Sequence, residues 1–256
     1  MCFSATSSFI ASGVIGTIGL ATLRHVREPR SLLFAALPIL FALHQFTEGF
    51  VWLGLEGEVG SVALDHTAFL FMLYGQGVLP LLLPVAVLLM EPQGLRQRAI
   101  AALVAMGALV CIWMVYGVIA YPSQCYVEHH SIAYRNQVTS DVGMTLLYIA
   151  VTCGALLLST HRVIRWFGAF NVAALLIAQA FKAYAFTSVW CFFAAGLSII
   201  IYWQFKHSKF DFLKIGSFSK EHAPDQLSWL QMPGRGIEEP YAGHPEKTGT
   251  ARLEDQ

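Results

Sequence analysis

Two side chains that can exchange protons lie within one long apolar stretch of this sequence. Residues 31–55 are long enough to cross a bilayer, yet they contain His44, Gln45 and Glu48. His44 and Glu48 are four residues apart and would share one face of a helix. A charged group in a membrane helix is costly, and it faces a partner or a cavity rather than lipid. We therefore place the chemistry of this protein around Glu48.

Cysteine and histidine residues elsewhere in the chain could complete a metal site with Glu48. Cys2 precedes the first apolar stretch, His130 lies in the longest segment between stretches, and Cys191 begins the last stretch. Thiolate, imidazole and carboxylate groups are the usual ligands of zinc. Three such ligands with one open position would activate a bound water, and a lipid or amide reached from the membrane would be the natural substrate. The sequence thus predicts a divalent metal such as zinc, held by residues of different helices.

Simpler structural roles are open for some of these residues. Lys182 either pairs with Glu48 or extends toward the membrane interface. Two of Cys2, Cys125 and Cys191 could form a disulfide bond in an oxidising compartment. In that case the same residues would hold the helices together without binding a metal.

Two residues near the ends of apolar stretches have common structural explanations. Asp65 is expected to cap the start of a helix, where its carboxylate would accept hydrogen bonds from free N–H groups. Trp52 is expected in the belt of aromatic side chains at the membrane interface. Neither residue is therefore placed in the site.

Composition points to a membrane protein. Of the 256 residues, 56% are hydrophobic and only 12% are charged, which is too apolar for a soluble domain. The formal net charge is zero, so no overall field favours nucleic acid. The five cysteines have no CxxC spacing, which gives no sign of a zinc ribbon or a redox pair.

The apolar stretches predict an all-α, polytopic bundle of seven transmembrane helices. Gly75, Gly77, Pro80 and Pro84 predict a bend in the third helix, whose freed carbonyl groups need other partners. Gly13, Gly16 and Gly19 predict a close approach of another helix to the first. The predicted helices are residues 3–23, 31–55, 62–89, 99–121, 141–159, 166–186 and 188–205.

The loops of such a bundle differ strongly in charge. The connections after the first, third, fifth and seventh helices hold ten basic residues, and the other side holds Arg135 and Lys182. This asymmetry predicts that the N-terminus lies outside and the C-terminus in the cytoplasm. Residues 1–206 would form the membrane domain. Residues 207–256 would form a cytoplasmic tail, with lysines and aromatics suited to an anionic leaflet and then a disordered segment.

Several motifs resemble an uncharacterised family of bacterial multi-pass membrane proteins. They are the opening Met1-Cys2-Phe3-Ser4-Ala5, the segment Thr47-Glu48-Gly49-Phe50-Val51-Trp52, and Ser188-Val189-Trp190-Cys191-Phe192-Phe193. The resemblance covers the helices but not the tail, and it implies a fold and a bacterial inner-membrane location without an activity. Cys2, Glu48 and Cys191 fall within its motifs, whereas His44 stands where the family more often has glutamine.

Three classes of function remain for such a protein. The first is a metal-binding or metal-dependent site at the outer face, which would include an enzyme. The second is a receptor-like sensor that signals through the tail to a protein partner, since its topology is receptor-like. The third is a transporter of ions or small molecules, which ranks lower because the ionisable groups gather toward one side of the bundle. A lipid bilayer is the expected partner in all three, and nucleic acid in none.

Overall fold

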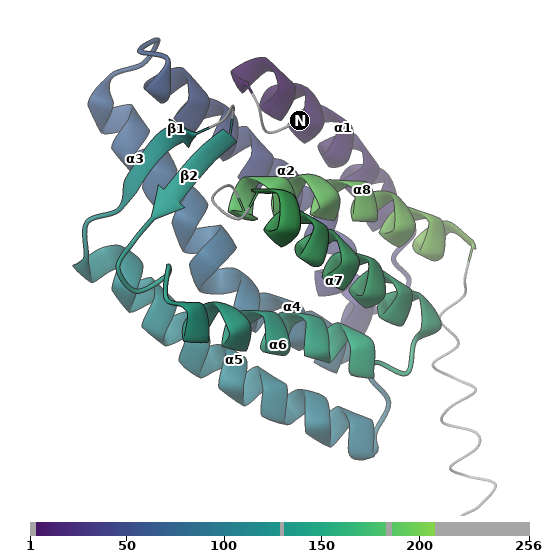
Figure 1. Ribbon diagram of the computed structural model, residues 1–256. Coiled ribbons are helices and arrows are strands. Elements are labelled where there is room, and N and C mark those ends of the chain that lie inside the picture. The colour runs from purple at the N-terminus through teal and green to yellow at the C-terminus, as the bar shows by residue number, and fades with distance from the viewer. Residues whose placement is uncertain (1–3, 129–130, 183–185, 208–256) are drawn as a thin grey trace, which may run out of the picture. The chain divides into compact units, whose positions relative to one another are not determined.

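The computed structural model describes residues 4–128, 131–182 and 186–207, without the side chains of residues 177–195 (Figure 1). All of these residues belong to one compact unit, Met1–Asp211. The described residues are mostly helical, as predicted, and they form seven helical segments. The predicted division at residues 206 and 207 stays a prediction, because residues 208–256 lie outside the described part of the chain.

The first four helical segments begin and end close to the predicted positions. The second begins with one 3-10 turn, and the third is continuous through a central π-helical part. Their elements are α1 (Ala5–Leu23), η1 (Pro29–Ser31), α2 (Leu32–Leu55), α3 (Ser61–Met72), η2 (Leu73–Val78), α4 (Leu79–Met90) and α5 (Leu95–Ala120).

The second half of the chain begins with a β-hairpin and continues with three helices. The sequence predicted helices and loops only, so the hairpin was not expected. These elements are β1 (Gln124–Glu128), β2 (Ser131–Arg135), α6 (Val142–Leu158), α7 (Arg162–Lys182) and α8 (Phe186–His207).

Four segments are long and apolar enough to cross a membrane: Ala5–Leu23, Pro29–Leu55, Ser61–Met90 and Leu95–Ala120. Large apolar side chains are exposed along them, as expected for helices that face lipid. These features indicate a membrane protein. The seven-span topology and the orientation of the termini stay predictions of the sequence.

The helices pack in a closed sequence of neighbours, because α8 returns to α1 and α2 while α4 to α8 follow one another (Figure 1). The closest pair is α1 with α2. The Ser12 hydroxyl donates to the Ala42 carbonyl oxygen over 2.8 Å, and a Cβ added at Gly19 would lie 2.9 Å from the backbone nitrogen of Ile39. Gly16 also faces Ala42, whereas no atom of the described residues lies within 4 Å of a Cβ added at Gly13. The predicted glycine contact is therefore confirmed at two of its three positions.

The irregularity predicted in the third segment is a π-helical stretch, and a carbonyl group that it frees has a hydrogen-bond donor. In an i→i−5 ladder the N–H of residue 80 would bond to the carbonyl of residue 75, but residue 80 is proline and has no N–H. The freed Gly75 carbonyl instead accepts a 2.7 Å hydrogen bond from the Tyr148 hydroxyl of α6. This buried bond joins the middle of the third segment to α6.

Tyr148→Phe is expected to lower the free energy of unfolding by about 1–2 kcal/mol, because the Gly75 carbonyl would lose its buried donor. Unfolding with a denaturing detergent in mixed micelles measures this change. Tyr116→Phe is the matched control, since Tyr116 is half exposed on α5. Equal stability of the two variants would contradict the assigned role of Tyr148.

The segment expected to be a loop, residues 122–140, holds the antiparallel pair β1–β2, with Cys125 opposite Tyr134 and Val127 opposite Ile132. Asn136 fixes the hairpin to the end of α5. Its side-chain amide donates to the carbonyls of Gly117 and Tyr121 over 3.0 and 3.2 Å. The Gly117 carbonyl also accepts from the Tyr121 N–H, whereas the Tyr121 carbonyl follows the end of α5.

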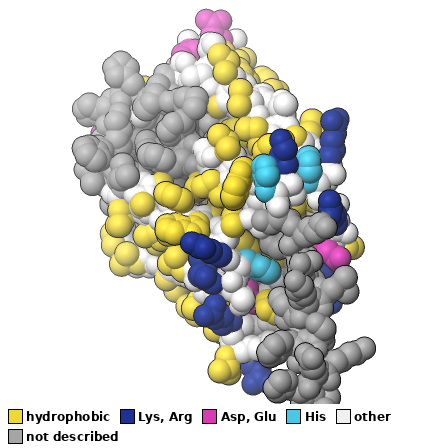
Figure 2. Space-filling view, turned by 90° about the vertical axis from the view of Figure 1, so that its right-hand side faces the viewer, with side chains coloured by type: hydrophobic (Ala, Val, Ile, Leu, Met, Phe, Trp, Pro, Cys, Tyr) yellow, Lys and Arg dark blue, Asp and Glu magenta, His cyan; other side chains and the backbone are white. Residues whose placement is uncertain are grey.

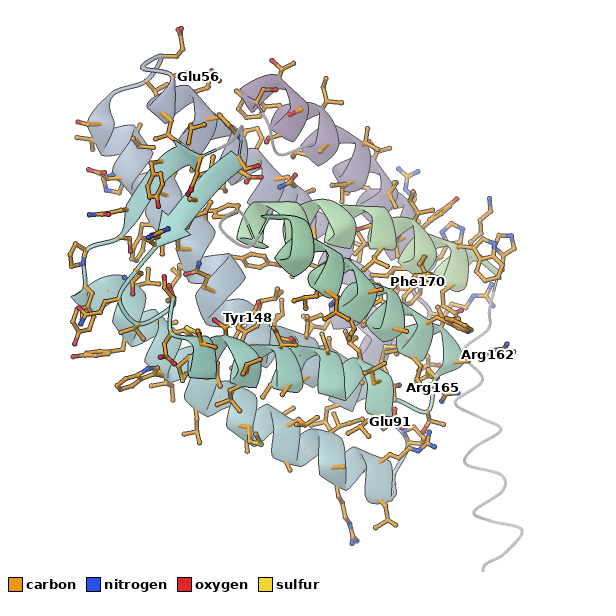
Figure 3. All side chains as sticks on the ribbon, in the orientation of Figure 1. Glu56, Glu91, Tyr148, Arg162, Arg165 and Phe170 are labelled. Carbon is orange, nitrogen blue, oxygen red and sulfur yellow. The ribbon has the colours of Figure 1, made fainter. Side chains whose placement is uncertain are left out.

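The helices have two chemically different ends. The hairpin end carries β1–β2, and its described charged residues are mostly acidic. The basic end carries the α1–α2, α4–α5 and α6–α7 connections with most of the arginines. Figure 3 labels Glu91, Arg162 and Arg165 at the basic end and Glu56 at the opposite end. The structure thus brings together the charges on which the predicted orientation depends.

Helix caps differ from the one that the sequence predicted. The Ser4 hydroxyl accepts from the backbone N–H of Ser7 and caps the start of α1. Asp65 is not a cap, because α3 begins at Ser61 after Gly60, which places Asp65 in its second turn. The prediction for Asp65 is therefore wrong, because Gly60 occupies the cap position and Asp65 lies inside the helix.

Candidate functional site

The candidate site is the buried face of α2 near the hairpin end. Glu48 is completely buried, and His44 and Trp52 lie one turn away on either side with only 4% of their surfaces exposed. The four-residue spacing places all three on one stripe of the helix. The predicted burial of Glu48 is confirmed. Trp52 is not an interface residue, because it packs in the core.

The side chain of Gln45 contacts the carboxylate of Glu48. Its side-chain amide donates a 2.7 Å hydrogen bond to Oε2 of Glu48, and Gln45 itself is 1% exposed. A carboxylate removed from bulk solvent needs such donors, because leaving it without hydrogen bonds is costly. Gln45 therefore holds the carboxylate in position within α2.

His44 belongs to a stack of three rings that crosses three elements. Its ring lies 3.9 Å from that of Phe71 on α3 with an interplanar angle of 11°. Phe71 stacks in turn on Tyr134 of β2, at 4.4 Å and 19°. At these separations the two neighbours must occupy opposite faces of Phe71. The hairpin is thus joined through Phe71 to His44 of the site.

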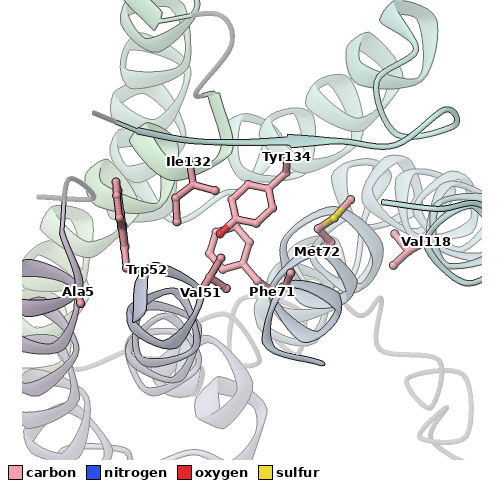
Figure 4. Packing of buried hydrophobic residues seen from close by; sticks show 9 residues of the cluster. Ala5, Val51, Trp52, Phe71, Met72, Val118, Ile132 and Tyr134 are labelled. Atoms are coloured by element: carbon pink, nitrogen blue, oxygen red, sulfur yellow. The ribbon is translucent and has the colours of Figure 1, made fainter. Parts of the chain in front are cut away.

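The hairpin covers the site through β2. Ser131, Ile132 and Ala133 are completely buried, and Ile132 and Tyr134 pack in one cluster with Trp52 (Figure 4). Continuous burial of consecutive residues shows that both faces of β2 are covered. One neighbour is α8, which also contacts α1 and α2. The site therefore lies where α1, α2, α8 and β2 meet.

The wall formed by α1 is set by its antiparallel packing against α2. Phe9 contacts the position of Gly49, where a Cβ would come within 2.6 Å of its ring, and Ser12 bonds to Ala42. Ser8 consequently lies level with the turn that holds Gln45 and Glu48, and it is completely buried. Its hydroxyl adds a further polar group at this level.

Several polar atoms of this region have no hydrogen-bond partner among the described residues. They include both ring nitrogens of His44, Nε1 of Trp52, and the hydroxyls of Ser8 and Ser131. A buried polar atom without a partner costs on the order of 1–3 kcal/mol. Native proteins therefore rarely keep several such atoms together, except where a ligand, an ion or water binds.

Most of the predicted metal ligands cannot be placed. Cys2 and His130 lie outside the described residues, and so do the side chains of Lys182 and Cys191. The described residues contain no group of three or more His, Cys, Asp or Glu side chains suited to a metal. The structure thus brings together Glu48, Gln45 and His44, and the complete ligand set stays a prediction.

Cys125 is a free thiol on β1, so its proposed role in a disulfide is wrong in this structure. Burial against the hairpin cluster, and then the negative charge of Asp65, raise the pKa of the Cys125 thiol above its ordinary value. A thiol with a raised pKa is a poorer nucleophile and a poorer metal ligand at neutral pH. Pairing of Cys2 with Cys191 stays a prediction.

A second buried carboxylate, which the sequence analysis missed, lies at the basic end. Glu91 is 4% exposed and accepts hydrogen bonds from the Ser159 hydroxyl at 2.9 Å and from the Thr160 backbone N–H at 2.8 Å. The Thr160 hydroxyl also donates to it. Arg165 in turn donates to the Ser159 and Thr160 carbonyls. This arrangement clamps the α4–α5 connection to the α6–α7 connection.

The fold and the buried polar face define a helical protein with four segments able to cross a membrane and a polar site inside it. The chain belongs to a family of unknown function, DUF6629, which matches residues 1–212. The predicted membership of an uncharacterised family is confirmed at that level. No curated protein and no solved structure was found to match the chain.

Proposed function

We propose that this protein is a polytopic membrane protein that binds a divalent metal, such as zinc, at Glu48 near the hairpin end of its helices. The observation that carries the proposal is the complete burial of the Glu48 carboxylate near polar atoms of His44, Trp52 and Ser8 that have no hydrogen-bond partner among the described residues. A buried carboxylate of this kind gains most from a cation, which also orders neighbouring polar groups.

The packing of the elements supports the ligand set expected from the sequence. Cys2 lies two residues before the Ser4 cap of α1, His130 directly precedes β2, and Cys191 lies within α8. The elements that carry or follow these residues contact one another, since α1 and α8 pack on α2 and α8 packs on β2. Metal binding by Cys2, Glu48, His130 and Cys191 is therefore consistent with the fold.

In this proposal Gln45 and His44 would not bind the metal. They would support Glu48, which binds it. Gln45 already orients Glu48 by its hydrogen bond, in the manner in which outer groups orient metal-binding carboxylates. His44 lies one turn deeper and stacks on Phe71. The sensor and transporter alternatives stay predictions, and the tail that the sensor alternative requires lies outside the described residues.

The test is elemental analysis of the full chain, purified in mild detergent without a histidine tag. We expect near-stoichiometric metal in the wild type and its loss in Glu48→Gln, a change that removes charge while keeping size. Glu56→Gln is the matched control, because Glu56 is an exposed carboxylate at the same end of α2. It should keep the metal.

Two results would overturn the proposal. One is the absence of any bound metal in wild-type protein whose circular dichroism shows folded helices, even after addition of zinc. The other is equal metal content in Glu48→Gln and wild type. Cys191→Ser then extends the test to the ligand set, since it should lose metal to the same extent as Glu48→Gln.

A further inference from the structure

The ends of α1 and α8 bring cationic and aromatic side chains together at the basic end. The His25 and Tyr202 rings meet edge to face with their centres 5.9 Å apart, and Nζ of Lys206 lies 5.6 Å from the centre of the Tyr202 ring. Figure 2 views the molecule from the side on which α8 ends and shows Lys, Arg and His side chains beside hydrophobic ones. Tyr202 thus links the two helix ends.

The cations of this cluster are not neutralised within the described part of the chain. Arg24, Arg27 and Lys206 are exposed, and none forms an ion pair with a described residue. The described acidic residues at this end are Glu28, which is exposed, and Glu91, which is buried in its own hydrogen bonds. The surface therefore has a local positive charge suited to an anion.

Apolar strips lead from the membrane-facing sides of both helices to these cations. On α1, Leu20 is 59% exposed and lies one turn before Arg24. On α8, Ile199 and Trp203 are 57% and 56% exposed, and Lys206 follows Trp203 by three residues. Residues at these spacings share one face of a helix. Each helix thus presents exposed apolar side chains followed directly by a cation.

We propose that the ends of α1 and α8 bind the headgroup of an anionic phospholipid. The phosphate would lie against Arg24 and Lys206, Trp203 would lie at the level of the headgroups, and the acyl chains would follow Leu20 and Ile199. A soluble anion would use the cations but would gain nothing from the apolar strips. The observed combination therefore favours a lipid, independently of the metal proposed at Glu48.

The experiment titrates the full chain in mild detergent with phosphatidylglycerol or phosphatidylcholine and follows binding by tryptophan fluorescence. We expect preference for phosphatidylglycerol. Arg24→Gln/Lys206→Gln should weaken its binding about 25-fold, since each basic residue near a lipid surface contributes roughly fivefold. The matched control is Arg96→Gln/Arg98→Gln, which removes the same charge from the exposed first turn of α5 at the same end. It should bind within twofold of the wild type.

Three results would overturn the proposal. Equal loss in both double variants would show a general charge effect without a site. Equal affinity for the two lipids would show that the cations only stabilise the C-terminal ends of the helices. Competition by inorganic phosphate at constant ionic strength, with the same affinity as the lipid, would show a site for a soluble anion.

Discussion

Replacement of Glu91 by alanine is expected to lower the free energy of unfolding by about 3 kcal/mol, one of the two largest effects that this structure predicts. The carboxylate accepts from the Ser159 hydroxyl and from the backbone and side chain of Thr160. Its removal would leave buried donors without an acceptor and would release the two connections from each other. Unfolding with a denaturing detergent in mixed micelles measures the loss.

The control for this prediction is Glu28→Ala, which removes an exposed carboxylate at the same end and should change stability little. Glu91→Gln should fall between the two, because the amide keeps one acceptor oxygen and loses the charge. A Glu91→Ala variant as stable as Glu28→Ala would show that the clamp contributes nothing to folding.

Gly107→Ala is expected to destabilise the protein by about 2–3 kcal/mol through overpacking. A Cβ at this position of α5 would collide with the Pro80 carbonyl oxygen and would lie 3.1 Å from Cγ1 of Val151. The Pro80 carbonyl belongs to the backbone of α4 and cannot rotate away. The helices α4, α5 and α6 would therefore have to separate at their contact.

Gly13→Ala tests the same chemical change where no atom of the described chain is near. It should be neutral or stabilising by up to about 1 kcal/mol, since alanine favours the helix over glycine. Stability of both variants would be followed by the loss of helical circular dichroism on heating. If the two alanine variants behaved alike, the close contact of α5 with α4 would be wrong.

Hydropathy was sufficient to predict the helical segments and the burial of Glu48. Long apolar runs fix where a helix can cross a membrane, and a carboxylate within such a run has few places to lie. The same reasoning predicted a freed carbonyl in the third segment, because Pro80 has no N–H. It could not identify Tyr148 as the donor, since that residue lies 73 positions away from Gly75.

The errors have equally physical causes. Glu91 stands beside a proline in a short connection, so its sequence gave no sign of burial; its donors are 68 and 69 residues away.

The hairpin was missed because its strands are five residues long and lie between helices in a segment with no clear alternation. One signal was present, namely Ile132 and Tyr134 on alternate positions of a short run. Trp52 was misplaced because an interface residue and a core residue at a helix end have the same hydropathy.

The π-helical stretch imposes a length constraint on the third segment. An i→i−5 turn accommodates one residue more than an i→i−4 turn, so η2 acts as an inserted residue between α3 and α4. Removing one residue from Leu73–Val78 would restore a regular helix and rotate α4 by roughly 100° relative to α3. The face of α4 that now meets Gly107 would turn toward lipid, while Phe71 stayed on His44. The number of residues in this stretch therefore fixes the rotation of α4 relative to α3. That rotation, more than the identity of the residues, allows the Glu48 site and the α4–α5 contact to form together.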